Sequence, residues 1–143
     1  ARQRAGPIYQ AGTLSGNPVA MAAGLAQLNI ITDHPEIYTV METSASYIAN
    51  HLRASAEKHG IAMQVNQIGS LLCPYFTETP VNCYAAAKKS DTKRYAAYFN
   101  GMLKRGIYLA PSQFEAMFVS SVHTQNDLAC TVQAAEETLS EMA

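Results

Sequence analysis

Apolar residues first gather into a run that is hydrophobic on nearly every side, from Val19 to Ile31. Asn17-Pro18 precedes this run, and proline is favoured in the first turn of a helix because its missing N–H would have no partner there. The pattern predicts a helix over residues 17–32. Because a helix without a polar face is usually buried on most sides, we expect another domain or another protein to cover it.

Three later segments carry the three-to-four spacing of amphipathic helices. The first begins after Pro35 and ends near His59, with Gly60 as its stop. The second is capped by Ser90-Asp91 and runs through Arg105, and the last begins at Thr124, whose partner in a capping box is Asp127. The expected inward positions of the last two helices are Tyr95, Phe99, Met102 and Leu103, then Leu128, Val132, Ala135, Leu139 and Met142.

Alternation of period two predicts a strand over residues 62–67, a turn at Gly69-Ser70 and a returning strand over 71–76. Pro74 places the returning strand at a sheet edge or at a bulge, since proline donates no ladder hydrogen bond. Further strands are expected at Ile107–Leu109 and Met117–Val122. Antiparallel strands with helices grouped beside them predict an α+β layer fold.

The hydrophobic content and the net charge of the chain indicate which kinds of binding partner to expect. The chain has 143 residues, of which 48% are hydrophobic and 15% charged, with a net charge of −1. These values are typical of a globular domain and disfavour a charge-driven nucleic-acid or membrane partner. No membrane span is expected. Because Ala1 is not an initiator residue, we expect sequence upstream of it.

Metal and thiol chemistry are not indicated. Cys73, Cys83 and Cys130 show no CxxC spacing, and the four histidines share no metal-ligand spacing. We expect free structural thiols in a reducing cytoplasm and no metal site. The pairs Glu136-Glu137 and Lys88-Lys89 are expected on solvated faces.

Two loops carry candidate chemistry. The segment from Tyr9 to Pro18 combines Gly12, Thr13, Ser15 and Gly16 at a helix start, where backbone N–H groups can bind a phosphate. An ordinary capped helix start explains the same residues. The segment 110–116 places Glu115 in an otherwise uncharged loop, which fits either a buried active-site carboxylate or an exposed surface acid.

Two motifs add a resemblance to a known family. The stretches YQAGTLSGNPVAMAAG and GIYLAPSQFEAMFVSSVHTQND closely resemble the C-terminal part of the glutamate-1-semialdehyde 2,1-aminomutase family. These are class-III aminotransferase-like, fold-type-I enzymes dependent on pyridoxal 5′-phosphate. The T-x-x-G-N-P core is shared across the aminotransferase class, whereas the APSQFEA loop is more specific to the aminomutases.

The resemblance implies roles for individual residues. Gly12 and Thr13 would contact the cofactor phosphate, in the active site of the other subunit of a homodimer, and Tyr9 would lie at the cofactor and substrate edge. Glu115 would lie at the substrate pocket. Ser112 and Gln113 would shape the loop. The implied reaction converts glutamate 1-semialdehyde into 5-aminolevulinate, a tetrapyrrole precursor.

The family's Schiff-base lysine and its pyridinium-binding aspartate precede the matching region. None of the chain's lysines sits in a matching motif; they are Lys58, Lys88, Lys89, Lys93 and Lys104. The resemblance therefore implies that residues 1–32 end a large cofactor domain, that residues 33–143 form a small C-terminal domain, and that the chain alone is inactive. Two alternatives are part of a class-III ω-aminotransferase and a non-catalytic dimerisation module.

Overall fold

The computed structural model describes residues 12–143, so Tyr9 lies outside the described residues. The chain divides into two compact units, Ala1–Pro35 and Glu36–Ala143. The first contains helix α1 (Pro18–Asp33). The second contains α2 (Glu36–Lys58), β1 (Gln64–Ile68), β2 (Leu71–Tyr75), α3 (Tyr84–Ala87), α4 (Thr92–Lys104), β3 (Met117–Phe118) and α5 (Gln125–Glu141).

Helix α1 confirms the helix predicted over residues 17–32. Its start is fixed by Asn17, whose side-chain oxygen accepts hydrogen bonds from the backbone N–H groups of Val19 and Ala20. None of the residues of α1 is buried. Within this chain the helix leaves a wide apolar surface uncovered, with Val19, Met21, Leu25, Leu28 and Ile30 all more than half exposed. The expectation that another domain or another protein covers it stays a prediction.

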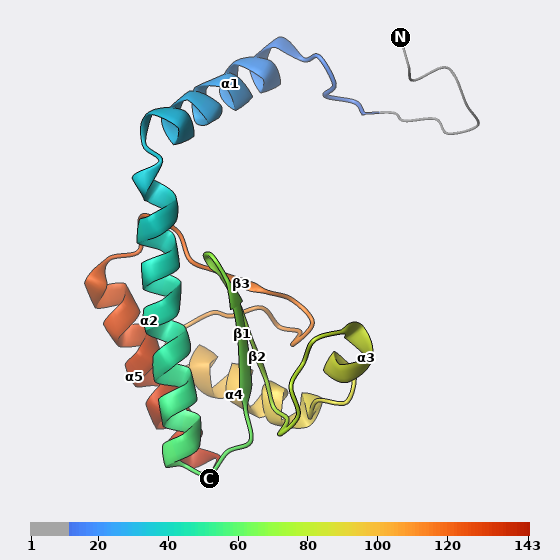
Figure 1. Ribbon diagram of the computed structural model, residues 1–143, viewed down its shortest axis with the longest axis vertical. Helices are drawn as coiled ribbons and strands as arrows, with labels where there is room; N and C mark the ends of the chain where they lie inside the picture. The colour runs from blue at the N-terminus through green and yellow to red at the C-terminus, as the bar shows by residue number, and fades with distance from the viewer. Residues whose placement is uncertain (1–11) are drawn as a thin grey trace, which may run out of the picture. The chain divides into compact units, whose positions relative to one another are not determined.

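In the second unit, helices α2 and α5 pack against each other and form one side of the core (Figure 1). The predicted capping box at the start of α5 is present, because Thr124 and Asp127 exchange hydrogen bonds. The predicted inward stripe of α5 is largely confirmed: Leu128, Ala135 and Leu139 are buried, and Val132 and Met142 are half-buried against the core. These two helices therefore follow from side-chain periodicity alone.

The sheet has three antiparallel strands in the order β1-β2-β3. The predicted hairpin is correct, and Gly69 makes its turn with φ +51°. Strand β2 lies in the middle of the sheet, which corrects the expectation that Pro74 marks an edge strand. Strand β3 pairs only with Leu71 and Leu72, so Pro74 has a strand partner on one side alone and its missing N–H costs no bond to β3.

Two other strand predictions need correction. Residues 107–109 form no strand, and the strand expected over Met117–Val122 is only the two residues of β3. The side chains of Ile107 and Leu109 pack partly against the core from an irregular segment. The apolar side chains of Ile107 and Leu109 indicate burial, but they do not establish that the backbone pairs with another strand.

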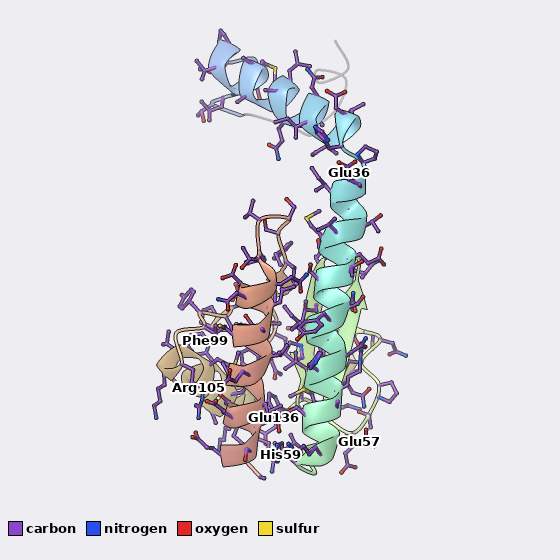
Figure 2. All side chains as sticks on the ribbon, turned by 90° about the vertical axis from the view of Figure 1, so that its left-hand side faces the viewer. Glu36, Glu57, His59, Phe99, Arg105 and Glu136 are labelled. Atoms are coloured by element: carbon purple, nitrogen blue, oxygen red, sulfur yellow. The ribbon has the colours of Figure 1, made fainter. Side chains whose placement is uncertain are left out.

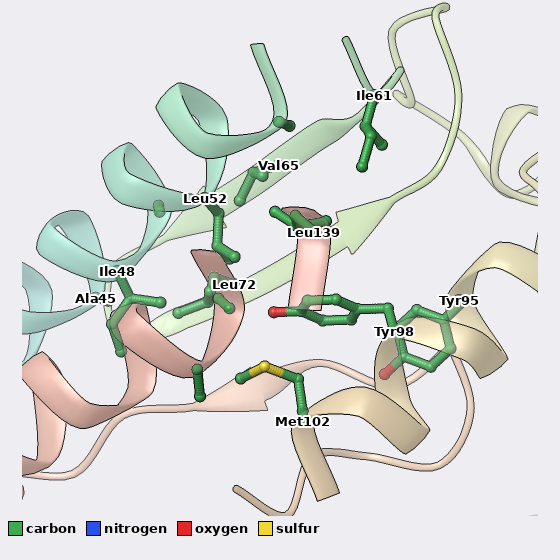
Figure 3. Close-up of a cluster of buried hydrophobic side chains, with 14 of the residues drawn as sticks. Ala45, Ile48, Leu52, Ile61, Val65, Leu72, Tyr95, Tyr98, Met102 and Leu139 are labelled. Atoms are coloured by element: carbon green, nitrogen blue, oxygen red, sulfur yellow. The ribbon is translucent and has the colours of Figure 1, made fainter. Parts of the chain in front are cut away.

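Helix α4 begins at its predicted cap, where the Asp91 side chain accepts from the backbone N–H groups of Lys93 and Arg94. One inward position was wrong: Leu103 is 45% exposed, whereas Tyr98 is fully buried. Figure 3 shows Tyr98 lying between Leu139 and Met102 in the core. Tyr95 and Met102, both predicted inward, are buried with it.

Helices α4 and α5 approach each other closely at Gly101. A Cβ atom at this position would collide with the Thr138 side chain, which is almost fully buried. The absence of a side chain at Gly101 therefore sets how near the two helices approach.

A polar cluster joins the end of α2 to α5. Glu136 accepts hydrogen bonds from Ser55 and Lys58, and its Oε1 lies 2.9 Å from Nε2 of His59. In Figure 2, His59 and Glu136 face each other near the C-terminal ends of their helices. Glu136 is thus a link between helices rather than a residue of a solvated face, which corrects that expectation.

Candidate active-site loops

The first candidate loop is the turn Gly12–Asn17. The N–H of Ser15 donates to the carbonyl of Gly12 (3.1 Å), and the N–H of Asn17 donates to that of Leu14 (3.0 Å). A Cβ at Gly12 would lie 2.5 Å from the Ser15 hydroxyl oxygen, so only glycine fits without a shift. Gly16 completes the turn with φ +77°.

This geometry decides which groups of the loop can bind an anion. The N–H groups of Val19 and Ala20 already donate to Asn17, so the first turn of α1 is capped by the protein itself. The exposed turn before it carries the Thr13 hydroxyl and backbone N–H groups. The N–H groups of Val19 and Ala20 are thus already satisfied by Asn17, whereas Gly12 and Thr13 lie in the exposed turn before the helix.

The second candidate loop is Ala110–Ala116, between α4 and β3. Ser112 organises it: its hydroxyl accepts from the N–H of Phe114 (3.2 Å), and its carbonyl accepts from the N–H of Glu115 (3.1 Å). Gln113 is buried, and within the described residues its side-chain amide has no hydrogen-bond partner. Ser112 thus forms a turn in the loop through two hydrogen bonds, whereas Gln113 is buried in it without a side-chain hydrogen bond.

Glu115 is exposed on this loop and lines a cavity of about 410 Å³. The apolar wall includes Ile48 and Leu72, and the polar residues of the lining include His123, Asp127 and Thr131. Sequence reasoning left open whether Glu115 is a buried carboxylate or an exposed acid. The structure places it on an exposed loop at the cavity.

Two of the polar lining residues are held in place by local bonds. Hydrogen bonds from Thr124, followed by the nearby His123, hold the pKa of Asp127 below its usual value. Nδ1 of His123 accepts the N–H of Ser120 at 2.9 Å. Asp127 therefore stays ionised, while His123 is fixed by its own backbone turn.

Two buried side chains, Tyr95 and Cys73, donate hydrogen bonds to the backbone of this loop. The sequence did not predict this connection. The Tyr95 hydroxyl donates to the carbonyl of Ala110 (2.6 Å), and the Cys73 thiol donates to the carbonyls of Gln113 (3.4 Å) and Glu115 (3.6 Å). Their sequence signal was only apolar periodicity, which predicts burial but not a bond to a distant loop.

The predicted site residues fall into both units. Gly12 and Thr13 belong to the first unit, and Glu115 belongs to the second. Among the residues that the structure describes, no group of three or more His, Cys, Asp and Glu side chains could hold a metal ion, and no helix is long and apolar enough to cross a membrane.

The amino-acid sequence of the chain is similar to those of several named enzymes. No family model matches the chain. Over 136 residues, or 95% of its length, the chain is 57% identical to the glutamate-1-semialdehyde 2,1-aminomutase of Ruminiclostridium cellulolyticum. It is 50% identical over 135 residues to the enzyme of that name from Deinococcus radiodurans. The chain corresponds to the C-terminal portion of this aminomutase family. It spans only 31% and 30% of the length of these two relatives.

Solved structures agree on the fold of this portion. The chain superposes on a β-phenylalanine aminotransferase from Variovorax paradoxus with a TM-score of 0.82 and 26% identity, over 99% of this chain and 32% of that one. A glutamate-1-semialdehyde aminomutase from Pseudomonas aeruginosa gives 0.68 and 18% identity, over 76% and 24%. The α+β prediction is therefore confirmed, and the fold matches part of the fold-type-I pyridoxal-phosphate aminotransferases.

Proposed function

We propose that this chain is the C-terminal part of a pyridoxal-phosphate-dependent aminomutase that isomerises glutamate 1-semialdehyde to 5-aminolevulinate. The observation that carries the proposal is the 57% identity to a named aminomutase over 95% of this chain. Gly12, Thr13 and Glu115, the described residues to which the proposal gives ligand contacts, all lie at exposed loop positions.

In this reaction an amino group leaves C2 of the five-carbon acid and is restored at C1, so no atoms are gained or lost. The cofactor, when bound, supplies the electron sink. The protein's own part is binding and orientation. The hydroxyl and backbone N–H of Thr13, with the Gly12 backbone beside them, would hold the cofactor phosphate. Glu115 would orient polar groups of the substrate at the cavity edge, and Tyr9 would lie at the cofactor edge.

Under this proposal, the chain supplies only part of the enzyme's domains and site residues. Residues 1–32 would end the large cofactor domain, and residues 33–143 would form the small domain. The Schiff-base lysine would come from the preceding large domain, so the chain alone should be inactive. The uncovered apolar surface of α1 suits a helix that packs into that domain. We also infer a homodimer, with Gly12 and Thr13 serving the neighbouring subunit's cofactor, and, from the three free cysteines, a cytoplasmic protein.

The test uses a chimera in which this chain replaces the matching C-terminal part of the Ruminiclostridium aminomutase. Thr13→Val removes a hydroxyl that donates to a charged phosphate, an interaction worth about 1.5–3 kcal/mol. The variant should lose the cofactor roughly 10- to 100-fold more readily on dialysis. Thr32→Val, at the far end of α1, is the matched control. Equal cofactor retention in both variants would remove Thr13 from the phosphate site.

Glu115→Gln tests the other loop in the same chimera. Turnover should fall by more than the affinity for cofactor, because Glu115 is assigned to the substrate and not to the phosphate. Glu57→Gln, an exposed glutamate of α2, is the control. An equal loss of turnover and cofactor affinity would give Glu115 a structural role instead.

A transaminase of the same class is the second candidate, because the fold superposes closely on an aminotransferase. A transaminase transfers its amino group to a second substrate, whereas the aminomutase returns it within one. The two functions therefore differ in whether an added amino acceptor is required.

A further inference from the structure

The Glu115 loop has no regular secondary structure, yet two side chains from other elements reach its main chain. The Tyr95 hydroxyl donates to one carbonyl, and the single S–H of Cys73 is shared between two others. Tyr95 on α4 donates to Ala110 at 2.6 Å, where the loop begins. Cys73 on β2 donates to Gln113 at 3.4 Å and to Glu115 at 3.6 Å, where the loop ends. Tyr95 is 3% exposed and Cys73 is 9% exposed.

Both side chains remain donors at neutral pH. Burial raises the pKa of the Cys73 thiol above its ordinary value. Burial first, then the nearby Cys73 and Glu115, raise the pKa of Tyr95 to about 12. A thiol and a phenol that keep their protons can each hold a carbonyl, whereas a thiolate could not.

We propose that Cys73 and Tyr95 are positioning residues for Glu115, acting only through the loop's backbone carbonyls. The proposal rests on the role given to Glu115 above. Because all three acceptors are main-chain oxygens, the Glu115 side chain remains exposed at the cavity while its backbone is held. Tyr95 thereby ties the loop to α4, and Cys73 ties it to the middle strand of the sheet.

Simple packing does not explain these two residues. An apolar side chain of similar size would fill the same space but would leave the carbonyls of Ala110 and Gln113 without these donors. Figure 3 shows the Tyr95 ring beside Tyr98, so Tyr95→Phe keeps the ring's packing and removes only the hydroxyl. Cys73→Ser keeps a donor at the second position, and Cys73→Ala removes it.

The first experiment measures amide hydrogen exchange in the 143-residue chain. Tyr95→Phe and Cys73→Ala should speed exchange at the N–H groups of Phe114 and Glu115 by about five- to tenfold relative to those of β1, since each loses about one net hydrogen bond. Cys73→Ser should recover part of the protection. Tyr108→Phe and Cys83→Ala, both at exposed positions, should change nothing. Unchanged loop exchange in folded Tyr95→Phe and Cys73→Ala would overturn the proposal.

The second experiment measures turnover in the chimera. Tyr95→Phe and Cys73→Ala should lower kcat by several-fold with cofactor affinity unchanged, and Cys73→Ser should restore part of kcat. Suppose that Glu115→Gln is slow, but that Tyr95→Phe and Cys73→Ala loosen the loop and keep full kcat. That result would overturn the positioning role. If Glu115→Gln is itself fully active, the proposed role of Glu115 fails, while the exchange data still decide whether the two side chains hold the loop.

Discussion

At the scale of single residues, Glu136 links α5 to the last turn of α2 through Ser55, Lys58 and His59 (Figure 2). The hydrogen bonds from Lys58, Ser55 and His59, in that order of effect, lower the pKa of Glu136 to about 2. Because the side chain is 36% exposed, solvent screens these interactions and each contributes modestly.

The sign of this shift sets a pH window. The pKa of Glu136 is lower in the folded state than the ordinary value of 4.5, so the folded state favours the ionised carboxylate. The stabilisation is complete above about pH 4.5 and is lost as the pH falls towards 2.

Glu136→Gln should therefore lower the free energy of unfolding by about 1 kcal/mol or less at pH 7. The difference from the unmodified chain should shrink between pH 4.5 and 2, as followed by urea unfolding at several pH values. Glu57→Gln is the control. A difference that stays constant down to pH 2 would show that the link does not depend on the charge of Glu136.

Sequence reasoning reached the residues of both loops but not what supports them. Asn17 was predicted to start a helix, and only the structure shows that its side chain accepts from the backbone N–H groups of Val19 and Ala20. The bonds from Tyr95 and Cys73 join positions 15 and at least 40 residues apart. No local pattern carries such pairings.

At the scale of elements, the approach of α4 to α5 depends on Gly101. A methyl group there would overlap the Thr138 side chain, which is almost fully buried and has little space in which to move.

Gly101→Ala should therefore destabilise the second unit by about 1–3 kcal/mol, although alanine is the better helix former. Gly24→Ala in α1 is the matched control, because a Cβ there meets nothing within 4 Å. Thermal unfolding of both variants measures the difference. A Gly101→Ala variant as stable as the control would mean that Thr138 moves aside at no cost.

The amphipathic helices α2, α4 and α5 were predicted well because each has a periodic apolar face of its own, and α4 and α5 also have caps. The strands were predicted less well because pairing depends on a distant partner. The hairpin was found from its turn at Gly69, whereas Ile107–Leu109, equally apolar, has no strand beside it and remains irregular. Leu103 was predicted inward in place of Tyr98, although Tyr95, Tyr98 and Met102 also follow the three-to-four spacing and form the buried face of α4.

At the scale of the whole molecule, the chain spans about a third of the relatives that it matches. Its two candidate loops lie in two units, and all five of its lysines lie in the second. Helix α1 is apolar and has no buried residue in this chain. Its cap and its helical form follow from its own residues, whereas its apolar composition is explained only under the proposal that a preceding domain covers it.

The most direct test of the account is acceptor-free turnover by the chimera. Purified and loaded with pyridoxal phosphate, it is given glutamate 1-semialdehyde without any added amino acceptor, and 5-aminolevulinate is measured. We predict formation within about tenfold of the parent enzyme's rate, a difference of about 1.4 kcal/mol or less in the barrier. A folded, cofactor-loaded chimera that makes no 5-aminolevulinate, or makes it only when an amino acceptor is supplied, would contradict the assignment.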